Sequence, residues 1–182
     1  MSASVLVAYA TRYGSTQEVA ETITTILREG GLEVDLKPIN EVHNLEDYDA
    51  VVLGAALYIG RWHKDARRFL LRHGNALSVR PVAIFALGPL HSDEHEKQGA
   101  RAALDKDLAK FPWLAPIDIE MFGGKLDASK LHFPDSLMTK VPASPFKDIP
   151  ISDVRDWVEI REWASKLALK LYAAMSHTSE VS

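Results

Sequence analysis

Four short runs rich in apolar residues constrain the fold more than any other feature of the sequence. They span residues 5–10, 50–55, 81–87 and 117–122. Runs of this kind are typical of strands that are covered on both faces, as in a parallel sheet packed between helices. Residues 34–36 alternate between apolar and polar side chains, which predicts a strand with one wetter face at the edge of the sheet. The sequence therefore predicts five strands.

Helical patterns separate these strands. Residues 16–29 carry apolar side chains at helical spacing and end before a Gly-Gly pair, a common helix stop. Residues 64–73 and 93–108 show similar patterns, and the last helix is expected over residues 152–175, with a capping Ser or Asp at its start. Only the link over residues 40–49 joins two strands without a full helix.

The alternation of strands and helices predicts an α/β fold. We expect a doubly wound five-stranded parallel sheet in the order 2-1-3-4-5, with helices on both faces. The 182 residues fit a single domain, in which residues 125–151 form a long loop insertion before the C-terminal helix. Ligands of such sheets bind outside the carboxyl ends of the strands, beside the point where the strand order reverses. The loops after residues 10, 55, 87 and 122 are therefore the candidate ligand-binding loops.

The loop after the first strand has the parts of a phosphate site. It combines hydroxyl side chains, a glycine and the free N–H groups of the following helix, in the segment Thr11, Arg12, Tyr13, Gly14, Ser15 and Thr16. Charge-assisted hydrogen bonds contribute roughly 1.5 to 3 kcal/mol each and a helix N-terminus about 0.3 to 1 kcal/mol, so no lysine is required. A plain helix cap is the alternative. The position of the loop at the reversal point favours the phosphate site.

The loops after the third and fourth strands supply what a flat ring system needs. The first of them contains Tyr58, Trp62 and a glycine. Aromatic stacking adds roughly 0.5 to 1.5 kcal/mol beyond area burial, and a glycine lets its peptide reorient. The alternative is that both aromatic rings simply cover the end of the sheet. The predicted contacts of a bound ring are Ala56, Leu57, Tyr58, Ile59, Gly60, Leu87, Gly88 and Pro89.

Composition and missing motifs exclude several classes of function. The chain has no cysteine, so a bound cofactor must carry any redox chemistry. A net charge of -4 argues against nucleic acid as a partner. Neither Gly-x-x-x-x-Gly-Lys-Ser/Thr nor Gly-x-Gly-x-x-Gly occurs, which disfavours ATP, GTP and tightly bound NAD. The pattern of a secretory signal and an apolar stretch of about 18 residues are both lacking, so the cytoplasm is the expected location.

With these loops in place, the sequence resembles the flavodoxin superfamily, and more closely its branch of menaquinone-dependent protoporphyrinogen IX dehydrogenases. The resemblance covers nearly the whole chain. The phosphate pattern of the superfamily is matched by Thr11, Gly14 and Thr16. Residues that resemble the branch in the second loop, after the fifth strand and in the last helix are Gly54, Ala55, Leu57, Gly60, Trp62, His63, Phe122, Gly124, Leu126 and Trp157.

The resemblance implies FMN as the cofactor and a flavodoxin-like fold. It also implies a small-molecule redox substrate, a porphyrinogen or a quinone, and at most peripheral contact with a membrane. The branch has a long insertion before the last helix, beside the flavin edge and implicated in substrate or membrane contact, and residues 125–150 occupy this place. An oxidoreductase of heme biosynthesis that passes electrons to a quinone is the activity this implies.

Several charged residues have a functional and a structural interpretation. His63 has an unperturbed pKa near 6.5 and is a candidate proton donor or substrate contact with Arg61, or else a structural residue at a helix start. A second group of basic residues is interpreted either as a rim that binds the carboxylates of a porphyrin or an acidic partner, or as a solvated helix face. It comprises Arg61, Lys64, Arg67, Arg68 and Arg72. The histidines at 91 and 95 do not share a regular helix turn, so we expect no metal site.

The leading hypothesis is therefore an FMN-dependent oxidoreductase, which positions the flavin and tunes its potential. The alternatives are a flavodoxin-type electron carrier with a redox protein partner, an NAD(P)H:quinone reductase and a flavin-free doubly wound domain. A carrier usually presents a strongly acidic face, which fits the modest net charge less well. The sequence leaves open whether the chain forms a homo-oligomer.

Overall fold

A computed structural model describes residues 3–91, 93–126 and 152–179 of the chain. Its centre is a parallel sheet with the strand order β2-β1-β3-β5-β6. Counted along the chain, these strands stand in the order 2-1-3-4-5, which confirms the predicted fold. Their bounds are Ser4–Ala10 for β1, Glu33–Pro38 for β2, Ala50–Tyr58 for β3, Val82–Leu87 for β5 and Asp118–Phe122 for β6.

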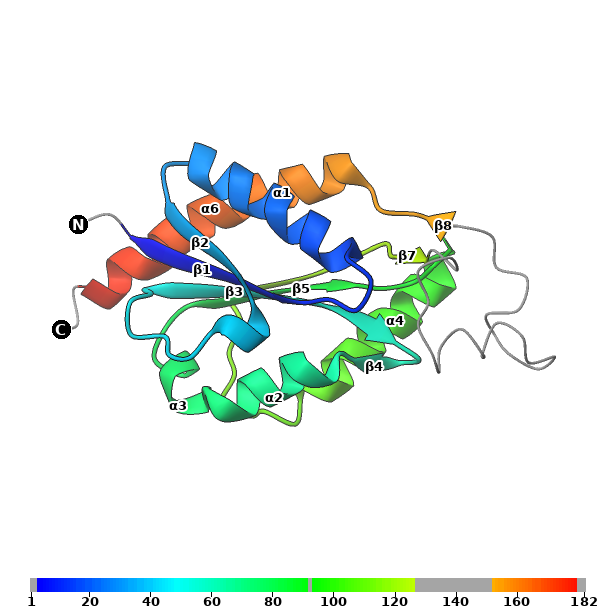
Figure 1. Cartoon of the computed structure of the whole chain (residues 1–182), viewed down its shortest axis with the longest axis horizontal. Coiled ribbons are helices and arrows are strands. Elements are labelled where there is room, and N and C mark those ends of the chain that lie inside the picture. Colours follow the sequence, from blue (N-terminus) through cyan, green and yellow to red (C-terminus); the bar gives the residue numbers. More distant parts are fainter. Residues whose placement is uncertain (1–2, 92, 127–151, 180–182) are drawn as a thin grey trace.

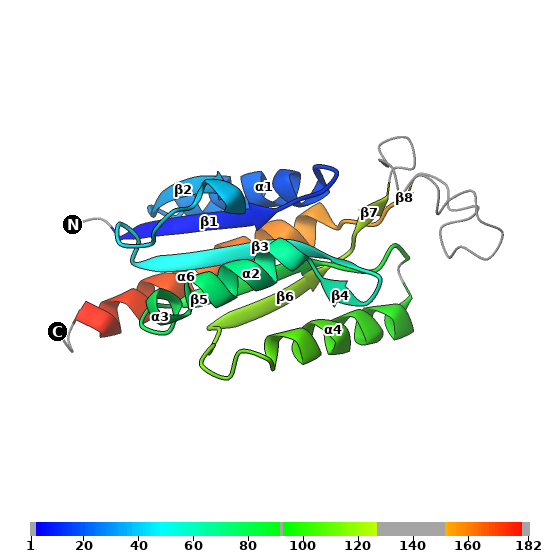
Figure 2. The same ribbon diagram turned by 60° about the horizontal axis from the view of Figure 1, so that its bottom comes forward.

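Helices cover both faces of the sheet, as Figures 1 and 2 show. One face carries α1 (Ser15–Glu29) and α6 (Trp157–Ser179), which pack on each other. The other carries α2 (Lys64–Arg72), the short α3 (Gly74–Leu77) and α4 (Glu94–Leu108). A 3₁₀ helix η1 (Ile39–Glu41) lies in the link between β2 and β3, where only a short helix was expected. In the described part of the chain, no helix is both long and apolar enough to span a bilayer.

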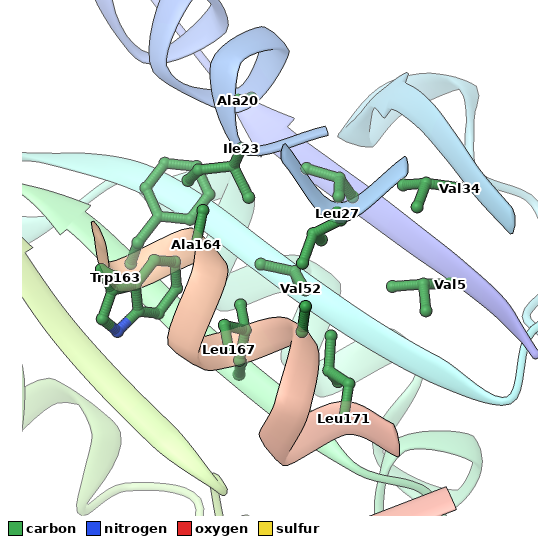
Figure 3. Close-up of a cluster of buried hydrophobic side chains, with 14 of the residues drawn as sticks. Val5, Ala20, Ile23, Leu27, Val34, Val52, Trp163, Ala164, Leu167 and Leu171 are labelled. Carbon is green, nitrogen blue, oxygen red and sulfur yellow. The ribbon is translucent and has the colours of Figure 1, made fainter. Parts of the chain in front are cut away.

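The core under α1 and α6 follows from helical spacing (Figure 3). Ile23 and Leu27 of α1 lie four residues apart, as do Leu167 and Leu171 of α6, and all four side chains are fully buried. They meet the strands around Val52. Burying one such side chain contributes about 1.5 to 3 kcal/mol. This packing fixes the start of α1 relative to the ends of the central strands.

The last helix begins five residues later than predicted. The Asp156 carboxylate accepts hydrogen bonds from the N–H groups of Val158 (2.9 Å) and Glu159 (3.1 Å), which caps α6. Residues Ser152–Asp153 instead form strand β8, which pairs with β7 (Lys125–Leu126). The predicted start at Ser152 was wrong because a backbone ladder holds that segment extended. Residues 125–126, the first two of the loop predicted for residues 125–151, belong to β7. Residues 127–151 lie outside the residues that the structure describes.

Strand β6 differs from the prediction of a strand covered on both faces. It is the last strand of the sheet, and four of its five residues are only half-buried. Its sequence alternates between acidic and apolar residues from Asp118 onward, which is the pattern of an edge strand. The other edge is β2, where an edge strand was predicted.

Candidate functional site

A cleft of about 1000 Å³ lies at the carboxyl ends of β1, β3 and β5, the edge at which doubly wound sheets bind ligands. This volume is at the upper end of the roughly 300 to 1,000 Å³ of typical ligand sites. The cleft brings together all four candidate loops, since residues that follow β1, β3 and β5 line it together with Gly124 to Leu126 after β6. All of the predicted binding residues except Gly14 line it, namely Thr11, Arg12, Tyr13, Ser15, Thr16, Ala56, Leu57, Tyr58, Ile59, Gly60, Leu87, Gly88 and Pro89.

The first loop turns sharply into α1 through Gly14. This residue has a φ of +90°, a left-handed conformation that side chains disfavour, and it occupies the N-cap position. The loop is closed by a 2.8 Å hydrogen bond from the Gly14 N–H to Oγ1 of Thr11. This bond uses the Thr11 hydroxyl as an acceptor, so its O–H remains able to donate to another group. From the sequence, Gly14 was predicted as part of the phosphate loop. In the structure it turns the backbone.

The start of α1 has the features of an anion site. Gly14 provides no side chain to cap the helix, and the first N–H groups of any helix lack partners within it. Thr16 lines the cleft at 1% exposure, and its Oγ1 has no hydrogen-bond partner in the structure as described. A buried hydroxyl without a partner costs about 1 to 3 kcal/mol, which a bound acceptor would recover. The residues present therefore fit a phosphate group.

Arg12 joins the first loop to the second. Its guanidinium lies 5.7 Å from the ring centre of Tyr13 and 5.4 Å from that of Tyr58. Cation–π contacts of this kind contribute about 0.5 to 1 kcal/mol each at exposed sites. The arginine thus holds an aromatic ring of each loop beside the cleft.

The second loop is a β-hairpin, which the sequence did not indicate. Strand β3 continues past the predicted end at residue 55 to Tyr58, and β4 (Arg61–Trp62) pairs with it in antiparallel fashion. Ile59 and Gly60 form the turn with φ values of 49° and 68°. Positive φ at both central positions is the geometry of a type I′ turn, which suits the twist of paired strands. Ile59 is a β-branched residue in a left-handed conformation, so the tip is strained, and its side chain is 60% exposed.

Trp62 and Asp107 anchor this hairpin to the body of the fold. Trp62 is buried, and its indole N–H donates to the carbonyl of Ala55 at 3.0 Å. Its backbone N–H donates to Oδ2 of Asp107 on α4 at 2.8 Å. Burial alone would raise the pKa of Asp107, but hydrogen bonds from Lys110 and from the Trp62 backbone outweigh it and lower the pKa. The role of Asp107 was not predicted from the sequence, because nothing around this residue distinguishes it from its acidic neighbours on the helix.

His63 caps α2 and also lines the cleft. Its Nδ1 accepts from the N–H of Asp65 at 3.2 Å, so the hydrogen of the neutral ring resides on Nε2. Burial lowers the pKa of His63, and the Asp65 carboxylate at 3.8 Å only partly opposes this. A neutral imidazole follows, with Nε2–H as its donor.

The third loop is fixed by glycines that leave no room for a side chain. A Cβ on Gly124 would clash with the backbone carbonyl oxygen of Gly88, and a Cβ on Gly88 would force the Met121 side chain to move. The N–H of Gly88 donates to the carbonyl of Phe122 at 2.7 Å, and that of Gly124 donates to the carbonyl of Pro89 at 2.9 Å. Helix α4 and β7 complete the wall, and their residues were not predicted as ring contacts. These are Glu96, Gly99, Ala100, Ala103, Lys125 and Leu126.

The predicted basic rim divides between two cavities. Arg61, Lys64 and Arg67 line the cleft, together with Arg12 and Lys125. Arg68 and Arg72 instead line a separate cavity of about 330 Å³. Cationic side chains outnumber carboxylates in the lining of the cleft, where the acidic residues are Asp65 and Glu96.

The histidine and acidic residues near position 91 do not gather into a metal site. Nδ1 of His91 lies 3.2 Å from a carboxylate oxygen of Glu96, and Asp93 caps α4 by accepting from the N–H of His95 at 3.0 Å. Within residues 3–91, 93–126 and 152–179, no three His, Asp or Glu side chains come close enough to hold a metal ion.

Known proteins resemble this chain in sequence and in fold. The family described as "Flavodoxin domain" matches residues 6–148. A protoporphyrinogen IX dehydrogenase [quinone] of Escherichia coli (strain K12) is 23% identical over 173 residues, which cover 90% of this chain and 93% of the relative. A protein of the same name from Leishmania major is 26% identical and covers 92% of this chain and 75% of the relative.

The solved structures that resemble this fold include flavodoxins. A flavodoxin from Pseudomonas aeruginosa, solved as a mutant, superposes with a TM-score of 0.56 at 16% identity. The match covers 93% of this chain and 99% of the flavodoxin.

Proposed function

The chain belongs to the flavodoxin domain family, and on this premise we propose that it is an oxidoreductase that binds FMN. One observation carries the proposal: at the start of α1 the helix has no side-chain cap, and the buried Thr16 hydroxyl has no partner among the described residues. A phosphate ester would accept hydrogen bonds from both. The chain contains no cysteine, so a cofactor has to carry the electrons.

The three loops divide the work of holding this cofactor. The loop Thr11 to Thr16 would hold the phosphate, and the hairpin around Tyr58 and the loop around Gly88 would border the ring. Bound flavin supplies the transfer of electrons between substrates. The protein keeps Tyr58 in place through Arg12 and through the Trp62 anchor of the hairpin. These contacts would fix the position of a bound ring and the residues along its edge.

The charge of the cleft supports an enzyme with an anionic organic substrate over an electron carrier. Arg61 and Lys64 border the cleft beside the hairpin, and carriers that dock on protein partners usually present acidic faces. The two relatives are named protoporphyrinogen IX dehydrogenase [quinone]. We therefore propose that the substrate is a porphyrinogen, whose carboxylates the basic side chains would hold, and that the acceptor is a quinone.

His63 and Arg61 are the proposed substrate contacts. The neutral imidazole has Nε2–H as a donor, so it can donate a hydrogen bond to a substrate directly. To accept one at Nε2, the ring would first have to change its tautomer. Arg61 is exposed at the mouth of the cleft, and the planar guanidinium of an arginine can pair with a carboxylate through two hydrogen bonds. The enzyme is proposed to act in the cytoplasm, with at most peripheral contact with a membrane.

An anaerobic assay tests this proposal. Protein loaded with FMN is mixed with protoporphyrinogen IX and a soluble quinone, and porphyrin fluorescence is followed. We expect turnover, with a KM for the porphyrinogen that rises severalfold in Arg61→Gln. The matched control is Arg68→Gln on α2, which lines the other cavity and should leave KM unchanged.

Three results would contradict the proposed substrate. Reduction of the flavin by NADH but not by protoporphyrinogen would make the chain an NAD(P)H:quinone reductase. Reduction only by a redox protein would make it an electron carrier. Equal effects of Arg61→Gln and Arg68→Gln would show that the basic border of the cleft does not bind the substrate.

A further inference from the structure

A buried arginine lies behind the start of α1, outside the cleft. The Arg155 side chain is only 2% exposed. Its Nε and Nη2 donate to the two carboxylate oxygens of Asp153 at 2.8 and 2.7 Å. Its guanidinium lies 4.7 Å from the ring centre of Trp157. This bidentate and stacked arrangement is one that arginine makes and lysine does not.

The third nitrogen of the guanidinium reaches α1. Nη1 donates to the carbonyl of Ser15 at 3.2 Å and to Oε2 of Glu18 at 2.5 Å. Ser15 is the first residue of α1 and lines the cleft, whereas Arg155 does not line it. The arginine therefore touches the proposed phosphate loop from behind, across 140 positions of sequence.

Glu18 creates the need for such a contact. It is an acidic residue in the first turn of α1, four positions after Gly14, which is slightly more than one helical turn or about 6 Å along the axis. The positive end of the helix dipole favours a carboxylate there, but the same end is where a phosphate would bind. Two anions at this separation repel each other unless one is neutralised. Lys125 lies 3.9 Å from the same Glu18 oxygen and adds a weaker neutralising contact.

We infer that Arg155 is a positioning residue that neutralises Glu18 and supports Ser15, so that the start of α1 accepts the dianionic phosphate of the cofactor. The inference rests on the proposed binding of FMN. The cluster balances two carboxylates, Asp153 and Glu18, against Arg155 and Lys125. Removing the arginine leaves a net negative charge beside the phosphate loop. The binding of the isoalloxazine ring, which carries no phosphate, should change little with that charge.

The test compares the affinities of two flavins that differ only in the phosphate. Dissociation constants for FMN and for riboflavin are measured by fluorescence quenching with wild type and with Arg155→Met. We expect the FMN affinity to fall roughly 10-fold in the variant. Riboflavin affinity should change less than about twofold, because the ring contacts lie on other loops. An equal loss for both flavins, or no loss for either, overturns the inference.

Arg28→Met is the matched control. Arg28 is another arginine tied to backbone carbonyl oxygen, with Nε and Nη2 at 3.1 and 2.6 Å from the carbonyl of Val34. It lies in the last turn of α1, far from Gly14. Its loss should leave the ratio of the FMN and riboflavin affinities within about twofold of wild type. A ratio that falls as in Arg155→Met would show that general loosening of α1 causes the effect.

The double variant Glu18→Gln/Arg155→Met tests the charge argument even where Arg155→Met alone does not fold. Glu18→Gln removes the carboxylate in the first turn of α1, and Lys125 offsets the charge of the remaining Asp153 carboxylate. The double variant should therefore have the same affinity ratio as Glu18→Gln. A ratio at least fivefold lower in the double variant would mean that Arg155 acts without Glu18, which overturns the inference. Wild type that binds neither flavin would refute the proposed function, and this inference with it.

Discussion

Asp107 offers a sharp test of how the hairpin at the cleft is held. Its carboxylate accepts the backbone N–H of Trp62, which is buried, and pairs with Lys110. In Asp107→Ala the Trp62 N–H loses its acceptor in a place that water does not reach. An unsatisfied buried donor costs about 1 to 3 kcal/mol, and hydrogen bonds to charged groups are at the upper end of that range. We therefore expect a loss of about 2 to 3 kcal/mol in the free energy of unfolding.

The control for this variant lies on the same helix. Asp105 is half-exposed and pairs with Arg101 four residues earlier at 2.9 Å. Surface pairs of this kind contribute about 0 to 1 kcal/mol, so Asp105→Ala should cost less than about 1 kcal/mol. Asp107→Asn keeps an oxygen that can accept from Trp62 and should be intermediate. Urea unfolding gives the three values, and an FMN titration should show weaker binding for Asp107→Ala than for Asp105→Ala, because the hairpin borders the ring.

The pH dependence of the same variants has a definite sign. The pKa of Asp107 in the folded protein is lower than its ordinary value, so its stabilising contribution is complete above about pH 4 and is lost as the pH falls through the folded pKa. The stability difference between wild type and Asp107→Asn should be constant from pH 7 to 5 and shrink below about 4. Asp107→Ala that is no less stable than Asp105→Ala would refute the anchoring role of this carboxylate.

Three further substitutions test the backbone of the site. Gly14→Val forces a β-branched residue to a φ of +90° and should abolish FMN binding while circular dichroism shows a folded protein; wild-type affinity would mean that another loop binds the phosphate. Ile59→Gly relieves the left-handed strain of the turn and should raise the free energy of unfolding by up to about 1 kcal/mol, so a clear loss in urea unfolding contradicts the assigned turn. Gly54→Ala places a Cβ against the Phe85 ring, where there is no room for it, and should lower the free energy of unfolding by at least about 1 to 3 kcal/mol. Its control is Gly99→Ala, which has open space around its Cβ and should stabilise α4 by roughly 0.5 to 1 kcal/mol. Equal effects of the two variants on thermal unfolding would contradict this packing.

The strand order was predictable because buried parallel strands leave a strong pattern. Runs such as residues 50–55 have no polar positions to place in water, and alternation with helices leaves few ways to connect them. The resemblance to the flavodoxin superfamily is confirmed by the family that matches residues 6–148. The edge strand β6 was misjudged because its acidic residues were read as part of an apolar run.

The hairpin and the start of α6 depended on long-range contacts that local patterns do not contain. Nothing near Trp62 indicates that its N–H pairs with Asp107, 45 positions away, and this pair holds β4 against α4. Similarly, Ser152 is a good helix cap by residue type, but β8 pairs with β7 and leaves the cap to Asp156. Loop residues of the site were identified because they follow strand ends. The wall from α4 was missed because a helix is not usually counted among the ligand loops.

A phosphate-recognising flavin site at the start of α1 is the central claim about this protein. The most direct measurement is a titration of the purified protein with FMN and, separately, with riboflavin, followed by flavin fluorescence and by absorption after removal of free ligand. We expect one bound yellow chromophore per chain with FMN, and an affinity for FMN at least about tenfold above that for riboflavin, since even one charge-assisted hydrogen bond to phosphate contributes about 1.5 kcal/mol. No bound chromophore at micromolar excess of FMN, or equal affinities for the two flavins, would contradict the claim.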